Sequence, residues 1–161
     1  MGLGDIMMFD QELFSRILLM ILLPFVFVVM IIPYIKNIAV RIGAVDVARP
    51  NTRHIHKKTT PKLGGLAIFF GFLLGYMFFG THSSIMNAIL IGSFIIIITG
   101  VIDDITELGP FTKFVGQLAA SLVIVFYGKL LISDITAFGL YINFSFLSYP
   151  LTIFFILGCI N

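Results

Sequence analysis

Two adjacent carboxylates, Asp103 and Asp104, close a long apolar run and are the residues of this chain that most directly suggest chemistry. The run over residues 85–102 contains no charged residue, so the pair stands where apolar chain meets polar surroundings. Two like charges disfavour each other and both lose hydration beside an apolar segment, so a cation is expected next to them. A divalent metal ion with a phosphate substrate would meet this need. The alternative is a helix end solvated by water.

A lysine and an amide follow the acidic pair. Lys113 and Gln117 are four residues apart, so they share one face of a helix. A lysine that reaches a phosphate and an amide that orients it suit phosphoryl transfer, in which positioning and electrostatic stabilisation do most of the catalytic work. The alternative is structural: Lys113 extends its ammonium to lipid headgroups and Gln117 bonds to a neighbouring helix.

Composition predicts that these residues are positioned by a membrane protein. Hydrophobic residues make up 59% of the chain, charged residues 11%, and the mean hydropathy is +1.10. Soluble domains carry roughly 25% charged residues. The net charge of +2 is too small to suggest a nucleic-acid partner, so the lipid bilayer is the expected environment.

Five apolar segments are expected to cross the bilayer as helices, over residues 13–35, 64–80, 85–102, 114–132 and 147–161. The apolar core of a bilayer needs about 20 helical residues at 1.5 Å each. Residues 136–146 alternate apolar and polar side chains with period two, which predicts a short strand or β-hairpin. The predicted fold is an all-α polytopic membrane protein, a single domain over 1–161, with an external hairpin between the fourth and fifth helices.

The orientation follows from the basic residues. The loop over residues 36–63 holds seven of the ten lysines and arginines, so the positive-inside rule places it in the cytoplasm and the amino terminus outside. Helix parity then places Asp103, Asp104 and Asn161 on the same cytoplasmic face. Insertion energetics or attraction to anionic lipids would also account for a basic loop. The glycine pair at its end, Gly64 and Gly65, would offer helix N–H groups to a phosphate.

The order of several short motifs resembles one enzyme family. These motifs are Val45-Asp46, Arg49-Pro50-Asn51, Arg53, His56-Lys57-Lys58, Thr60-Pro61-Lys62-Leu63-Gly64-Gly65, Gly100-Val101-Ile102-Asp103-Asp104 and Lys113-Phe114-Val115-Gly116-Gln117. Together they resemble the polyprenyl-phosphate N-acetylhexosamine-1-phosphate transferases, most closely the bacterial undecaprenyl-phosphate N-acetylglucosamine-1-phosphate branch.

The resemblance implies a reaction and a site. Sugar-1-phosphate would pass from a UDP-sugar to a polyprenyl phosphate with release of UMP, at the cytoplasmic face of the bacterial plasma membrane. Mg²⁺, or Mn²⁺ in its place, would be held by Asp103 and Asp104, which are also the catalytic pair. Lys57, Thr60, Lys113 and Asn161 would bind substrate. The product would begin a surface glycan such as teichoic acid, and a homodimer is left open.

The departures from the family shape these expectations. Family members are longer, and they carry an acidic motif after the fifth crossing of which Ile160-Asn161 resembles the opening. The chain is therefore expected to be an amino-terminal half and to be inactive alone. Two alternatives stay open: a phospho-N-acetylmuramoyl-pentapeptide transferase, and a non-catalytic scaffold or transport module. A transporter would more often bury charge at mid-membrane, and no predicted crossing has an acidic residue at its centre.

Overall fold

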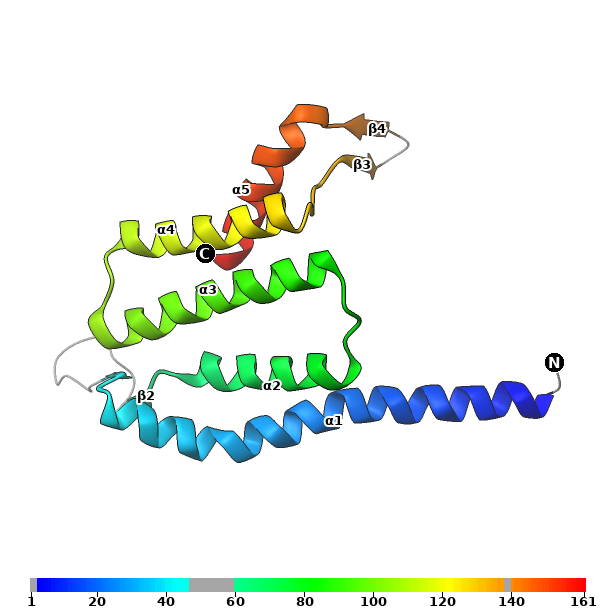
Figure 1. Cartoon of the computed structure of the whole chain (residues 1–161), viewed down its shortest axis with the longest axis horizontal. Coiled ribbons are helices and arrows are strands. Elements are labelled where there is room, and N and C mark those ends of the chain that lie inside the picture. The colour runs from blue at the N-terminus through cyan, green and yellow to red at the C-terminus, as the bar shows by residue number, and fades with distance from the viewer. Residues whose placement is uncertain (1–2, 47–59, 138–139) are drawn as a thin grey trace. The chain divides into compact units, whose positions relative to one another are not determined.

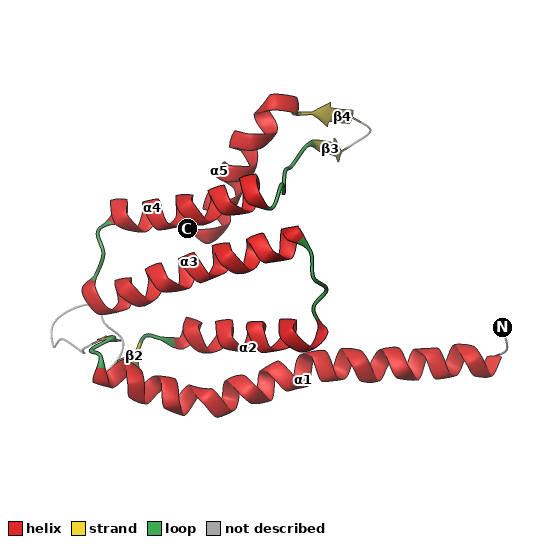
Figure 2. Cartoon of the chain, viewed as in Figure 1, coloured by secondary structure: helices red, strands yellow, loops and turns green. Residues whose placement is uncertain are grey.

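The computed structural model describes residues 3–46, 60–137 and 140–161, and these form mainly helices with two short strand pairs (Figure 2). They divide into two compact units, Met1–Gly80 and Thr81–Asn161. In the described ranges, three helical stretches are long and apolar enough to cross a membrane: Gln11–Arg41, Ser84–Thr106 and Pro110–Tyr127. Gly64–Phe79 and Ser145–Ile160 are shorter apolar helices. The predicted helical fold is confirmed to that extent.

The first unit contains helices α1 (Leu3–Arg41) and α2 (Gly64–Phe79) with strands β1 (Val45–Asp46) and β2 (Thr60–Pro61) (Figure 1). Helix α1 extends beyond the predicted 13–35, so residues 36–41 of the predicted basic loop are helical. Lys36 lies within the helix and Arg41 is its last residue, because long basic side chains have good helix propensity and favourable interactions with a helix carboxyl end. The helix ends just before Gly43, whose φ of +79° is a left-handed conformation that glycine adopts without strain.

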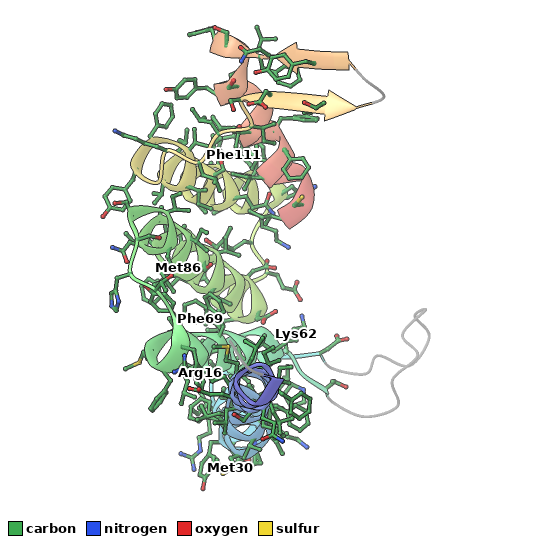
Figure 3. The ribbon with its side chains drawn as sticks, turned by 90° about the vertical axis from the view of Figure 1, so that its right-hand side faces the viewer. Arg16, Met30, Lys62, Phe69, Met86 and Phe111 are labelled. Atoms are coloured by element: carbon green, nitrogen blue, oxygen red, sulfur yellow. The ribbon has the colours of Figure 1, made fainter. Side chains whose placement is uncertain are left out.

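Close backbone approach joins α1 to α2. A Cβ at Gly75 would lie 3.0 Å from Pro24 Cγ, and one at Gly71 would overlap the Val28 side chain. From Leu13 onward many apolar side chains of α1 are exposed, Met30 among them, and the charged Arg16 is exposed as well (both are labelled in Figure 3). The two glycines therefore set a close α1–α2 contact. Ile35 and Ala39 of α1 are also buried, while many other side chains of α1 from Leu13 onward present the apolar surface expected of a membrane helix.

The second unit contains helices α3 (Ser84–Thr106), α4 (Pro110–Leu122) and α5 (Ser148–Ile160). A π-helical turn, η1 (Val123–Tyr127), continues α4, and a 3₁₀ turn, η2 (Ser145–Leu147), precedes α5. Between these turns lie antiparallel strands β3 (Asp134–Ala137) and β4 (Leu140–Asn143). The predicted hairpin is confirmed, although it begins two residues earlier than the predicted stretch and its second strand ends at Asn143.

Helix α4 begins at Pro110, before the predicted 114, and the helical structure that continues it ends at Tyr127, before the predicted 132, so both bounds differ from the prediction. Gly109 is its N-cap and Pro110 its first residue. Proline suits that position because its missing N–H has no helical partner there and its φ is preset. The helical structure ends at Tyr127, and Lys129 has a left-handed φ of +51°. An apolar run alone shows neither end, because residues 128–132 remain largely apolar after the helix has stopped.

Candidate functional site

The carboxyl end of α3 is organised by Asp103. Its backbone carbonyl accepts a hydrogen bond from Glu107 N–H at 2.9 Å, and its side-chain Oδ1 accepts one from Leu108 N–H, also at 2.9 Å. Glu107 has a left-handed φ of +49°, which turns the chain away from the helix. Asp103 therefore both ends α3 and fixes its own carboxylate in place.

Lys113 pairs with this carboxylate from the first turn of α4. Its Nζ lies 2.9 Å from Asp103 Oδ2, with the side chains 44% and 28% exposed respectively. Each charge is at the unfavourable end of its helix, since the helix dipole favours cations at carboxyl ends and anions at amino ends. A partly exposed pair also contributes at most about 1 kcal/mol to stability. Helix stability alone therefore gives little reason for these two charges to be here.

A close contact one helical turn away sets the register of this pair. A Cβ at Gly116 would lie 2.5 Å from Thr99 Oγ1 and 2.8 Å from Thr99 Cγ2, so α3 and α4 approach closely there. The two helices run antiparallel beside each other (Figure 1). Going one turn forward along α3 from Thr99 reaches Asp103, and going about one turn back along α4 from Gly116 reaches Lys113. The glycine thus lets the lysine meet the aspartate.

The ion pair borders a small pocket within the second unit. The pocket has a volume of about 160 Å³ and is lined from α3, α4 and α5 by Ile96, Thr99, Gly100, Asp103, Lys113, Gln117 and Ile160. The prediction that Lys113 and Gln117 share a face is confirmed, because both line this pocket. A carboxylate, an ammonium and an amide therefore converge on one space, which suits an anionic ligand bridged by cations.

A larger, mostly apolar groove adjoins the pocket at Gln117. It has a volume of about 430 Å³ and is lined by Phe114, Gln117, Phe154, Leu157, Gly158 and Asn161. Asn161, predicted as a binding residue, thus lies beside the pocket and shares the groove with Gln117. The polar pocket and apolar groove together would fit a ligand with a charged head and an apolar chain.

The other predicted site residues are placed as follows. Asp104 follows Asp103 on α3, is half-buried, and is not among the residues that line the pocket. Thr60 lies in the first unit, where β2 pairs it with Asp46 on β1. Lys57 lies outside the described residues. The convergence of the basic loop with the acidic pair therefore stays a prediction.

The described residues are compatible with a magnesium ion without forming a complete cage for one. Over residues 3–46, 60–137 and 140–161, no group of three or more His, Cys, Asp or Glu side chains could hold a metal. Mg²⁺ in phosphate-binding sites needs only one or two protein carboxylates, because substrate phosphates and water supply the remaining ligands. Asp103, at the pocket wall, and Asp104 beside it are the residues that would hold the ion.

Thr99, Gly100 and Ile160 line the pocket but were not predicted as site residues. Spacing could have suggested the first two, since Thr99 and Gly100 precede Asp103 by four and three residues and therefore share its helix face. Thr99 Oγ1 donates a hydrogen bond to the Ile95 carbonyl at 2.8 Å, so its hydroxyl is oriented within the helix. No local pattern marks Ile160, because α5 reaches the pocket through tertiary packing.

Comparison with known proteins finds one matching family. Residues 86–161 match the family described as glycosyl transferase family 4. The chain is 36% identical over 156 residues to a Bacillus subtilis (strain 168) protein named "Probable undecaprenyl-phosphate N-acetylglucosaminyl 1-phosphate transferase". The aligned residues make up 96% of this chain and 43% of that protein.

Two further relatives carry similar names. A decaprenyl-phosphate N-acetylglucosaminephosphotransferase of Mycobacterium tuberculosis (strain ATCC 25618 / H37Rv) is 36% identical over 104 residues, 58% of this chain and 25% of that protein. An undecaprenyl-phosphate alpha-N-acetylglucosaminyl 1-phosphate transferase of Pasteurella multocida (strain Pm70) is 27% identical over 113 residues, 70% of this chain and 31% of that protein. The chain spans less than half the length of each of these relatives. No solved structure matches it.

Proposed function

Because residues 86–161 of this chain match glycosyl transferase family 4, we propose that the full-length protein transfers N-acetylglucosamine-1-phosphate from UDP-N-acetylglucosamine to undecaprenyl phosphate. UMP is the second product, and the lipid-linked sugar begins a cell-surface glycan such as teichoic acid. The names of the three relatives, all referring to N-acetylglucosamine and a polyprenyl phosphate, support this sugar over the N-acetylmuramoyl-pentapeptide alternative.

The observation that carries the proposal is the Asp103–Lys113 pair at the wall of the pocket, 2.9 Å between Nζ and Oδ2. In the reaction, an oxygen of the lipid phosphate attacks the β-phosphorus of the UDP-sugar, and the bond to the bridging oxygen breaks to release UMP. Both reactants are anionic, so the site must offset their repulsion. Lys113 would do so by moving its ammonium from the carboxylate to a phosphate oxygen.

The neighbouring surfaces would position the two substrates. Gln117 would orient a phosphate oxygen through its amide N–H groups, since it lines both the pocket and the groove. The apolar side chains of Phe114, Phe154 and Leu157 would hold the first part of the polyprenyl chain. Lys57, Thr60 and Asn161 are proposed to contact the UDP-sugar or the lipid phosphate.

Asp103 and Asp104 would hold Mg²⁺, or Mn²⁺, which when bound would neutralise phosphate charge and align the donor diphosphate. We assign the two carboxylates one shared role, because adjacent carboxylates on one ion titrate as a unit. The site is proposed to face the cytoplasm of a multi-pass plasma-membrane protein. The 161-residue chain alone is expected to release no UMP, because it spans 43% of the Bacillus subtilis relative.

The test is a carboxylate-to-amide series in the full-length protein. Asp103→Asn and Asp104→Asn should each lower UMP release from UDP-N-acetylglucosamine by at least about 100-fold, the scale of losing a metal ligand or a transition-state contact. Glu107→Gln is the matched control, since Glu107 is an exposed carboxylate at the same helix end that does not line the pocket. Membrane insertion must be equal in all three variants. Near wild-type activity in both aspartate variants would contradict the proposal.

A further inference from the structure

The β3–β4 hairpin has two faces of different polarity. Its register pairs Ile135 with Ile142 across the strands, while the neighbouring pair is Thr136 with Tyr141. Successive side chains of a strand point to opposite faces, so the isoleucine pair occupies one face and the threonine–tyrosine pair the other. Ile135 is 44% exposed and Ile142 is 50% exposed. The apolar face of the hairpin is therefore uncovered within the part of the chain that the structure describes.

The root of the hairpin lies at the end of a membrane-length helix. The continuous helical stretch Pro110–Tyr127 has 18 residues and is at most about 27 Å long, slightly less than the roughly 30 Å apolar core of a bilayer. The chain that leaves Tyr127 therefore emerges no farther out than the headgroup region. Tyr127 itself is exposed, as aromatic residues at membrane interfaces commonly are.

The far side of the hairpin returns at once to an apolar helix. Phe146, 82% exposed, lies in η2 directly before α5. The hairpin base is tied to α5, because Ile132 N–H donates a hydrogen bond to Thr152 Oγ1 at 2.8 Å. Phe144 N–H donates to the Ser133 carbonyl at 2.9 Å, which closes the base. The two strands of the hairpin are thus connected at their base to helical segments that end near the bilayer surface. The faces of the hairpin therefore lie near that surface as well.

From these observations we propose that the β3–β4 hairpin lies in the lipid interface, with Ile135 and Ile142 inserted among acyl chains and Thr136 and Tyr141 toward water. A two-stranded hairpin is marginal in water on its own and needs a covered apolar face. The lipid supplies that cover. The occupant is lipid of ordinary composition rather than one specific headgroup, because no charged side chain lies on either of these two cross-strand pairs.

The chain allows a direct test because it contains no tryptophan, so one substitution gives one fluorophore. Ile142→Trp and Tyr141→Trp place the probe on adjacent residues of opposite faces. Each variant is reconstituted in phosphatidylcholine–phosphatidylglycerol vesicles and quenched with lipids brominated at shallow acyl positions, or with aqueous acrylamide. Bromolipid should quench the Ile142→Trp variant at least about twofold more than the Tyr141→Trp variant, since interfacial apolar faces sit roughly 5–10 Å deep. Acrylamide should show the reverse order.

Every other pattern overturns the proposal. Equal quenching of both probes by acrylamide would mean that the hairpin stands in water. Weak quenching of the Ile142→Trp variant by both agents would mean that protein, from this chain or a second copy, covers the apolar face. If the β4 variants do not insert, Ile135→Trp and Thr136→Trp repeat the comparison on β3, where the same two faces alternate. This result is independent of the catalytic proposal, since no hairpin residue lines the pocket.

Discussion

The two ends of the second unit differ in where their polar side chains lie and what they bind. At the α3–α4 turn, Asp103 and Lys113 direct charged groups to a pocket wall from the unfavourable ends of their helices. At the hairpin end, Thr152 is only 2% exposed, accepts the Ile132 N–H and donates its own hydroxyl to the Ser148 carbonyl. The polar groups at the α3–α4 turn line a pocket that a ligand could enter, whereas those at the hairpin end are hydrogen-bonded within the fold. This contrast separates candidate function from structure.

Enlarging Gly116 should affect the pocket end most strongly. Gly116→Ala would place a Cβ 2.5 Å from Thr99 Oγ1, forcing α3 and α4 apart and Lys113 away from Asp103. We expect a loss of about 1–3 kcal/mol in unfolding free energy, the usual cost of overpacking, together with a large fall in UMP release per folded protein. Thermal unfolding in detergent and UMP release measure the two effects.

Gly158→Ala is the matched control for the stability effect of that substitution; because Gly158 lines the proposed lipid groove, only stability is compared. Apart from its chain neighbours and the nearby backbone of its own helix, no described atom lies within 4 Å of a Cβ at Gly158, which is also on an exposed part of α5. Its stability should be unchanged or higher by up to about 1 kcal/mol, since alanine favours helices over glycine. Equal changes in unfolding free energy for the two variants would mean that the Thr99–Gly116 contact does not set the register.

Removing the Thr152 hydroxyl at the hairpin end should lower stability without lowering activity. Thr152→Val keeps the side-chain shape but leaves the Ile132 N–H without its acceptor, which should cost about 1–3 kcal/mol of stability. UMP release per folded protein should stay near wild type, because Thr152 does not line the pocket. Thr152→Ser, which retains the hydroxyl, should lose less stability. A large activity loss in the folded valine variant would break the contrast between the two ends.

The sequence predicted the parts of the fold that depend on composition and local pattern. Apolar length indicated the apolar helices of the described residues, and period-two alternation over 136–146 indicated the hairpin that the structure has between Asp134 and Asn143. Helix ends were less accurate, since α1 runs to Arg41 and α4 begins at Pro110. Charge does not stop a helix, and an apolar run continues past Tyr127 although the helix does not. Ends are decided by caps and backbone conformation, which hydropathy does not record.

The candidate site was predictable as a set of residues but not as a geometry. Helical spacing put Lys113 and Gln117 on one face, and the structure brings both to the pocket that Asp103 lines. The contact of Gly116 with Thr99, which aligns the helices, joins residues 17 positions apart and has no local signal. Ile160 reaches the same pocket from α5 for the same reason. Local pattern gives the face of a helix, while packing decides what that face meets.

The most direct test of the account is Lys113→Met in the full-length protein, measured for activity and stability in the same preparation. Because the Asp103–Lys113 pair contributes at most about 1 kcal/mol to folding, this substitution should change the unfolding temperature only slightly. UMP release should fall by about 100-fold or more, because the phosphate loses its ammonium partner. A large loss of stability with proportionate loss of activity, or near wild-type turnover, would contradict the assignment of Asp103 and Lys113 to the site.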